Sequence, residues 1–224
     1  MSRYLQIFKI TLPIFMGYIP LGITFGILAV SVNIPWYFVL FMSIFIYAGS
    51  AQFLAVVLFS SVATLVEIFI AIFLVNLRHF FYGLSMINEF KVLKGFMKKY
   101  AIFGLTDETF ALLKTLHLPK QEKEKMFVII TFVNQMYWVI GSAIGAFLGA
   151  NIKFDTKGIE FILTALFAVL AIELYRKNPA KKVLIASIFI GLFGIFVLPS
   201  KYMLILSLIF CAFTLFTCKS WIVK

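Results

Sequence analysis

The chain has little charge and few of the side chains on which enzyme chemistry depends. Only 13% of its 224 residues are charged, nine are acidic, and there are two histidines and two cysteines. It also lacks a glycine-rich phosphate loop, a His-Glu-x-x-His pair and a Gly-x-Ser-x-Gly elbow. We therefore expect no enzyme activity, no metal and no cofactor, and the missing phosphate loop argues against ATP hydrolysis by this chain.

Long apolar runs are what the chain has in abundance. Hydrophobic residues make up 63% of it, and its mean hydropathy is +1.06. A helix that crosses lipid needs about 20 mainly apolar residues, because its backbone N–H and C=O groups must all be bonded internally. Seven runs are candidate spans: 10–32, 36–59, 62–82, 127–150, 159–175, 182–198 and 202–218. The sequence thus predicts an all-α polytopic membrane protein forming one domain over 1–224, with spans in 10–82 and 127–218 and short helices in a connection over 83–126.

Lysine and arginine are distributed unevenly along the chain. The net charge is +11, which in so apolar a chain indicates membrane topology rather than nucleic-acid binding. If all seven runs cross, 15 of the 20 basic residues share one face, including eight lysines between 83 and 125. That face should be cytoplasmic, which puts the C-terminus in the cytoplasm and the N-terminus outside the cell membrane, despite Arg3 and Lys9. The conflict vanishes if one of the first three runs is re-entrant, and the break at 49–52 is the best candidate.

Glycines recur every fourth position in the first and fourth runs. Gly22 and Gly26 follow Pro20 in the first, and 141, 145 and 149 are glycines in the fourth. One interpretation is an inverted repeat, as in many transporters, with a binding site between the repeats. The other is that small residues at this spacing let helices pack closely. Either way, we expect Pro20, Gly22 and Gly26 to act in helix packing or as a hinge.

Gly49, Ser50 and Gln52 interrupt the second apolar run and form a candidate substrate site. A broken helix leaves backbone N–H and C=O groups free to hold a zwitterion. The alternative is that Ser50 and Gln52 make hydrogen bonds between helices. Because a glutamine so far from either end of the run is costly without a partner, we favour substrate binding.

The third apolar run ends in a polar cluster of Asn76, Arg78 and His79. Arginine can bind a carboxylate through two parallel hydrogen bonds, and histidine is a titratable donor. These three residues are therefore further candidates for substrate binding. The alternative is that Arg78 extends to the membrane surface while its neighbours cap the helix. His79 and Glu67 are the titratable groups nearest the spans, and proton coupling would fall on them.

Three acidic residues, Glu67, Asp107 and Glu108, are candidates for coupling to an ion gradient. Glu67 lies five residues into its run and about 16 Å along the helix from Arg78, so the two cannot pair. A structural role near the opposite interface is favoured for Glu67. Asp107 and Glu108 follow Thr106 in a pattern typical of a helix start.

Four segments stand out for their order and spacing: 20–26 (PLGITFG), 47–53 (YAGSAQF), 76–83 (NLRHFFYG) and 105–108 (LTDE). Together they resemble the AzlC family of branched-chain amino acid permeases. The resemblance is strong over 10–110 and looser afterwards, where Glu160 stands at a position that is often Asp in the family. It implies the large subunit of a two-component exporter of branched-chain amino acids, which works in the lipid bilayer with a small hydrophobic subunit of the AzlD type. The alternative function is a non-transporting membrane scaffold or regulatory subunit.

Overall fold

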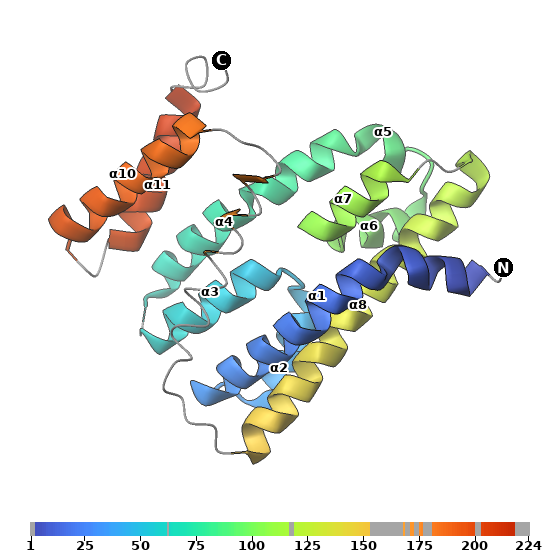
Figure 1. The fold of residues 1–224 in the computed structure, drawn as a ribbon, viewed down its shortest axis with the longest axis horizontal. Helices are drawn as coiled ribbons and strands as arrows, with labels where there is room; N and C mark the ends of the chain where they lie inside the picture. The colour runs from blue at the N-terminus through green and yellow to red at the C-terminus, as the bar shows by residue number, and fades with distance from the viewer. Residues whose placement is uncertain are drawn as a thin grey trace. The chain divides into compact units, whose positions relative to one another are not determined.

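The protein is helical in every region that its computed structural model describes. The described residues are 3–61, 63–116, 119–152, 168, 171–172, 175–176, 181–199 and 203–217. The helices are α1 (Arg3–Ser31), α2 (Trp36–Phe45), α3 (Gly49–Ser60), α4 (Leu65–Ser85), α5 (Ile87–Phe90), α6 (Gly95–Phe103), α7 (Asp107–Thr115), α8 (Lys120–Asn151), α10 (Lys181–Val197) and α11 (Met203–Thr217) (Figure 1). Most of the expected fifth span, together with Glu160, lies outside the described residues.

The chain divides into two compact units. The first consists of Met1–Ser61 and Asn76–Asp155, and the second of Val62–Val75 and Thr156–Lys224. Within the second, α10 and α11 pack together so closely that a Cβ on Gly194 would overlap the Ser207 side chain. All the functional candidates except Glu67 belong to the first unit.

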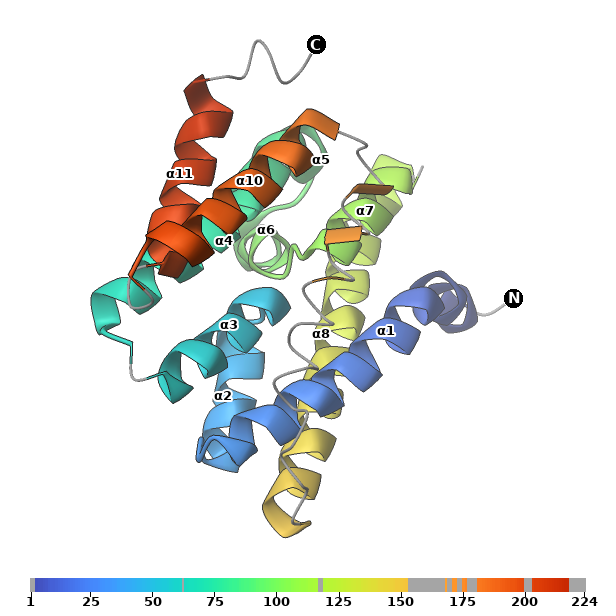
Figure 2. The ribbon, with the colours of Figure 1, turned by 60° about the vertical axis from the view of Figure 1, so that its left-hand side comes forward.

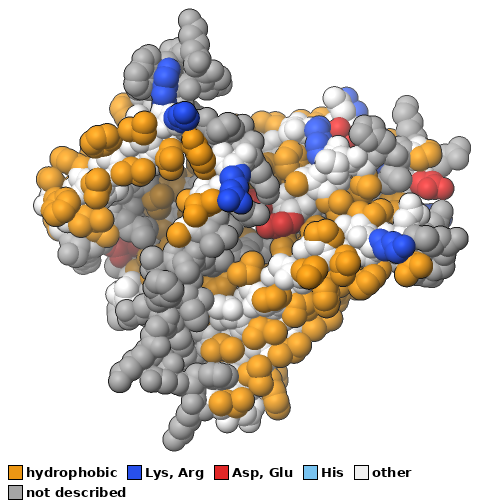
Figure 3. Space-filling model, viewed as in Figure 1, with side chains coloured by type: hydrophobic (Ala, Val, Ile, Leu, Met, Phe, Trp, Pro, Cys, Tyr) orange, Lys and Arg blue, Asp and Glu red, His pale blue; other side chains and the backbone are white. Residues whose placement is uncertain are grey.

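Three helices of the described residues are long and apolar enough to cross a membrane: α1, α4 and α8. They correspond to the first, third and fourth predicted spans, so the prediction of an all-α membrane protein is confirmed. The sixth and seventh predicted spans are α10 and α11, with 17 and 15 residues. On the face shown in Figure 3, hydrophobic side chains cover long stretches of α1 and α8, as expected for helices in contact with lipid.

The second predicted span is broken into two short helices. With 10 and 12 residues, α2 and α3 are about 15 and 18 Å long, well short of a lipid core about 30 Å thick. The chain turns at Tyr47, whose φ of +44° is left-handed, and α3 runs back toward the end where α2 begins (Figure 2). The break thus precedes the expected position, because Gly49 starts α3 instead of interrupting it. Seven of the α3 residues are buried, which is how irregular backbone survives at membrane depth.

The longest contact in the first unit is between α1 and α8, which run parallel. Thr11 Oγ1 lies 3.1 Å from Tyr137 Oη, and further along both helices Gly149 faces Ile27. Figure 1 shows the two helices side by side. An inverted repeat would place corresponding helices antiparallel, so α1 and α8 do not have the relation that the inverted-repeat interpretation of the glycines requires.

Glycines make the close approach of α1 and α8 possible. A Cβ on Gly22 would lie 3.0 Å from the Trp138 carbonyl oxygen, and one on Gly26 or Gly145 would overlap backbone of the opposite helix. The packing interpretation of Gly22 and Gly26 therefore agrees with the structure. Pro20 is exposed on another side of α1.

The beginning of α1 lies at the same end of the first unit as the polar connection. Ile7 belongs to a hydrophobic cluster formed mainly by the connection and the beginning of α8: Met86, Phe90, Leu93, Ala101, Leu105, Leu113, Met126, Phe127 and Ile130. This placement differs from the expected one, in which the N-terminus and the connection lie on opposite faces. The physical reason is that the α2–α3 pair turns back, so one crossing fewer separates them.

Candidate functional site

An ion pair and a hydrogen bond, both made by Arg78, join α4 to α7 and to α3. Arg78 of α4 contacts Asp107 at the start of α7, with 2.6 Å between Nη1 and Oδ2. The other terminal nitrogen of Arg78, Nη2, donates a hydrogen bond to Ser50 Oγ in the first turn of α3. The Arg78 and Asp107 side chains are 24% and 20% exposed. We call Ser50, Arg78 and Asp107 the ionic junction.

The start of α7 is set by its own sequence. Thr106 is the N-cap, and its Oγ1 accepts a hydrogen bond from the Thr109 N–H at 3.2 Å, as expected from the residues. Successive helical residues point about 100° apart, so Asp107 and Glu108 reach different partners. Asp107 faces Arg78, while Glu108 accepts a hydrogen bond from Tyr18 of α1.

The first turn of α3 adds an electropositive backbone to the junction. Its N-cap, Ala48, makes no side-chain hydrogen bond to the helix. The first N–H groups of a helix have no partners within it, and they attract anions, carboxylates included. Ser50 lies in this turn, beside the guanidinium of Arg78.

A chain of hydrogen bonds leads from Glu108 into the protein. Tyr18 Oη donates to Glu108 Oε2 at 2.7 Å and lies 2.6 Å from Thr106 Oγ1. Thr106 Oγ1 in turn lies 3.0 Å from Thr109 Oγ1, which accepts from Asn134 Nδ2 of α8 at 3.0 Å. Apart from Glu108, all of these side chains are buried. This series of hydrogen bonds therefore connects α1, α7 and α8.

Gln52 and Gly49 lie against Trp138 of α8. Gln52 is fully buried, its Oε1 accepts from the Trp138 indole N–H at 3.0 Å, and its Nε2 lies 3.5 Å from Ser43 Oγ. A Cβ on Gly49 would come within 3.1 Å of the indole ring. Gln52 thus makes the interhelical contacts that the sequence left open as the alternative to direct substrate binding.

A further hydrogen bond stabilises the break between α2 and α3. Gln135 Nε2 of α8 donates to the Ile44 carbonyl oxygen at 2.8 Å. The last carbonyls of a helix have no partners within it, and the bond satisfies one of these at membrane depth.

Asn76 and His79 lie on α4, close in sequence to Arg78. His79 Nδ1 is 3.3 Å from the Asn76 carbonyl oxygen, and its ring contacts Tyr82 with centroids 5.8 Å apart. Both residues are partly buried. Residues two apart on a helix point to opposite sides, so Asn76 and Arg78 do not form one surface.

Glu67 caps the start of α4. Its Oε2 accepts hydrogen bonds from the Thr64 N–H at 2.7 Å and from Thr64 Oγ1 at 2.8 Å. This reciprocal arrangement is a capping box. The geometry is that of the structural role favoured for this residue.

A second ion pair lies in the connection. Lys114 Nζ is 3.1 Å from Glu89 Oε1 and also donates to the Ser85 carbonyl oxygen. Slight burial acts to raise the pKa of Glu89, but hydrogen bonds from its own backbone N–H and from Lys114 outweigh it and lower that pKa below the ordinary value. The pair ties the end of α4 to α7.

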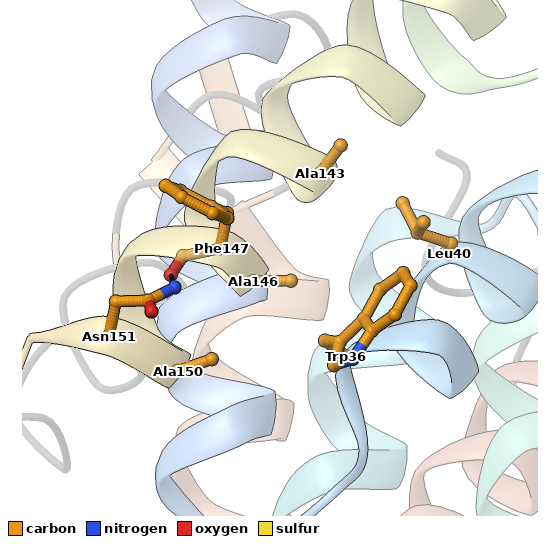
Figure 4. Close-up of a pocket in the computed structure, with 7 residues that line it drawn as sticks. All are labelled: Trp36, Leu40, Ala143, Ala146, Phe147, Ala150 and Asn151. Carbon is orange, nitrogen blue, oxygen red and sulfur yellow. Dashed lines mark hydrogen bonds between the residues drawn. The ribbon is translucent and has the colours of Figure 1, made fainter.

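One cavity of about 490 Å³ lies between α2 and α8. Its lining is mostly apolar, as Figure 4 shows: Trp36, Leu40, Ala143, Ala146, Phe147, Ala150 and Asn151. None of the lining residues belongs to the ionic junction, so the cavity is a separate feature. Among the described residues, no group of three or more His, Cys, Asp or Glu side chains could hold a metal ion.

Several residues of this region were not among the site residues predicted from the sequence: Tyr18, Asn134, Gln135 and Trp138. Asn134 and Gln135 could have been predicted, because burying an amide inside an apolar run is costly without a partner, as it is for Gln52. Tyr18 and Trp138 could not, since aromatic residues with one polar atom are common in membrane helices.

The fold and site define a class of protein: a helical integral membrane protein in which a broken helix begins beside a charged cluster, an arrangement that transporters use to bind substrates. Comparison with known sequences identifies the family. The AzlC protein family model matches residues 13–152, and the chain belongs to this family of membrane transport proteins.

Individual relatives agree with this assignment. A protein of Helicobacter pylori described as an uncharacterized membrane protein is 40% identical over 220 residues, which covers 93% of both chains. The branched-chain amino acid transport protein AzlC of Bacillus subtilis is 36% identical over 178 residues, 79% of this chain and 70% of that protein. The inner membrane protein YgaZ of Escherichia coli is 28% identical over 186 residues, 79% of this chain and 75% of that protein. No solved structure matches the chain.

Proposed function

We propose that the protein exports branched-chain amino acids, or similar small aliphatic zwitterions, as the large subunit of a two-component permease of the cell membrane. The observation that carries the proposal is the ionic junction, where a partly exposed arginine meets the start of a broken helix. The name of the Bacillus subtilis relative supports the substrate class. The partner is a small hydrophobic subunit of the AzlD type.

The carboxylate of the substrate binds between Arg78 and the first turn of α3. A guanidinium offers two parallel hydrogen bonds, and the free N–H groups of Gly49 and Ser50 add a positive field. His79, the next residue along α4, is the nearest of the other candidates in sequence, while Asn76 points away from Arg78 and acts on the site only through its carbonyl oxygen, which lies 3.3 Å from His79 Nδ1. Gln52 does not contact the substrate but positions the site, because its side chain accepts a hydrogen bond from Trp138 and so holds the indole ring against Gly49.

Coupling to an ion gradient rests on Glu108 rather than on Glu67. Glu108 accepts a hydrogen bond from Tyr18 of α1, so a proton taken up by its carboxylate would change a contact between two helices. Glu67 serves as a helix cap, and Asp107 is engaged by Arg78.

Both termini lie in the cytoplasm in the proposed topology. The cluster of Ile7 with the connection supports an N-terminus on the connection's side. With α2 and α3 re-entrant, six full crossings remain, and Arg3 and Lys9 join the other basic residues on the cytoplasmic face, as the positive-inside rule favours. The sequence conflict over the N-terminus is thereby removed.

Counterflow in proteoliposomes tests the proposal. The full chain is reconstituted with and without its small subunit, and exchange of labelled leucine is measured. We expect exchange with both subunits present and its loss in Arg78→Ala, while the yield of the complex is unchanged. No exchange by the pair would refute the transport proposal, and a lost complex in Arg78→Ala would favour a scaffold.

A further inference from the structure

The ion pair of the junction leaves one hydrogen-bonding atom unused on each partner. Arg78 Nε is a donor without an acceptor, and Asp107 Oδ1 is an acceptor without a donor. The Tyr82 hydroxyl, four residues after Arg78, is a hydrogen-bonding neighbour of the Asp107 carboxylate, but no donor lies within 3.5 Å of Oδ1 in hydrogen-bonding geometry. Buried polar atoms without partners are rare, and each calls for an explanation.

The pair is also accessible, unlike a purely structural one in a core. About a quarter of the Arg78 side chain and a fifth of the Asp107 side chain are exposed. The neighbouring carboxylate, Glu108, is held by Tyr18, so it does not compete for Arg78. Arg78 has a second anchor on Ser50, which can keep the guanidinium in place if Asp107 moves away.

An α-amino acid carries the same two charges as this pair, on one carbon atom. Its carboxylate can take the place of Asp107 on Arg78, and its ammonium can take the place of Arg78 on Asp107. No charge is left unpaired by this exchange, whereas a ligand with a single charge would strand one of the two side chains. Stranding a partly buried charge is strongly unfavourable.

We infer that the Arg78–Asp107 pair opens to bind both charged ends of one amino acid, with Asp107 as the ligand of the ammonium group. This inference rests on the proposed function and adds its recognition rule, namely that free ammonium and free carboxylate are both required. Nε and Oδ1 are buried while the pair is closed, and they become the extra donor and acceptor for such a substrate once the pair opens. The closed pair is then the state without substrate.

Three ligands of the same shape test the inference on the full chain with its small subunit in lipid nanodiscs. They are leucine, 4-methylpentanoate, which lacks the ammonium, and 3-methylbutylamine, which lacks the carboxylate. Binding is measured by calorimetry. In the wild-type protein, we expect both single-charge ligands to bind at least about tenfold more weakly than leucine.

Substitution of Asp107 should reverse part of this preference. In Asp107→Asn, leucine binding weakens by about tenfold or more, whereas 4-methylpentanoate binds at least as well as to the wild type, because Arg78 is released. In Arg78→Gln, the amine is retained and leucine is lost. Glu89→Gln is the matched control, since it also removes a carboxylate from an ion pair, and it should leave all three affinities unchanged.

The comparison of ligands within one variant separates recognition from folding. Equal weakening of leucine and 4-methylpentanoate in Asp107→Asn would overturn the inference, while leucine binding to the wild type would keep the proposed function intact. If Asp107→Asn binds none of the ligands, Arg78→Gln decides: retention of the amine supports the inference, and loss of all three overturns it. No leucine binding by the wild-type complex would refute the proposed function and, with it, this inference.

Discussion

The contact between α1 and α8 makes a sharp prediction for Gly26. A Cβ at this position would lie 2.7 Å from the Gly145 carbonyl carbon and nearer still to backbone atoms of Ser142 and Ala146. Because these are backbone atoms, no side chain can rotate away. The helices must separate until the shortest distances, 2.4 Å to the Ala146 nitrogen and the Ser142 carbonyl oxygen, reach the 3.4 Å of ordinary contact, which also loosens the stack of Phe25 on Trp138.

The cost can be isolated with a second glycine of the same helix. Overpacking a close contact costs about 1–3 kcal/mol, while Gly→Ala in a helix gains about 0.5–1 kcal/mol. A Cβ on Gly17 would have no atom within 4 Å, so Gly17→Ala receives the gain without the cost. The difference between Gly26→Ala and Gly17→Ala should therefore equal the overpacking term alone.

Unfolding in mixed micelles measures this difference. The purified variants are titrated with dodecyl sulfate, and helix content is followed by circular dichroism. We expect Gly26→Ala to unfold at a lower detergent fraction than the wild type, and Gly17→Ala at an equal or higher one. If Gly26→Ala proves as stable as Gly17→Ala, the close parallel packing of α1 and α8 is wrong.

Three further predictions concern the site and the topology. Gln52→Ala should lower stability by about 1–3 kcal/mol, since the buried indole N–H loses its acceptor, and an unchanged thermal midpoint would contradict that contact. Tyr18→Phe should alter the pH dependence of leucine counterflow while expression stays normal, because Glu108 loses its donor; an identical pH profile would remove Glu108 from coupling. Ser2→Cys should resist a membrane-impermeant maleimide in intact cells and react after permeabilisation, and labelling in intact cells would place the N-terminus outside.

The break in the second span could be predicted from the sequence only in part. Glycine is a helix breaker, so the sequence predicts the interruption at Gly49. In the structure, Gly49 begins α3 and faces the ring of Trp138, whereas Tyr47 takes the left-handed turn. That a break exists follows from composition, but its position depends on a contact 89 residues away in the chain.

The candidate site shows a similar division. Arg78 could be singled out because a cation in an apolar run is costly, and Thr106 because it caps a helix. Neither the cation in the apolar run nor the helix cap predicts which carboxylate pairs with Arg78. Asp107 and Glu108 fit the first turn of α7 equally well, and only the position of α4 and α1 around that turn assigns Asp107 to Arg78 and Glu108 to Tyr18.

By itself, the sequence determined that this protein resides in lipid as a set of helices, and it indicated 49–52 as the best candidate for a break in the second span. Those properties are local, since apolar runs must satisfy their own backbone hydrogen bonds wherever water is absent. Only the tertiary structure decided that α1 and α8 run parallel, that α2 and α3 turn back, and that Asp107 completes the ionic junction. These features depend on contacts between segments far apart in the chain, and such contacts cannot be predicted from the pattern of neighbouring residues.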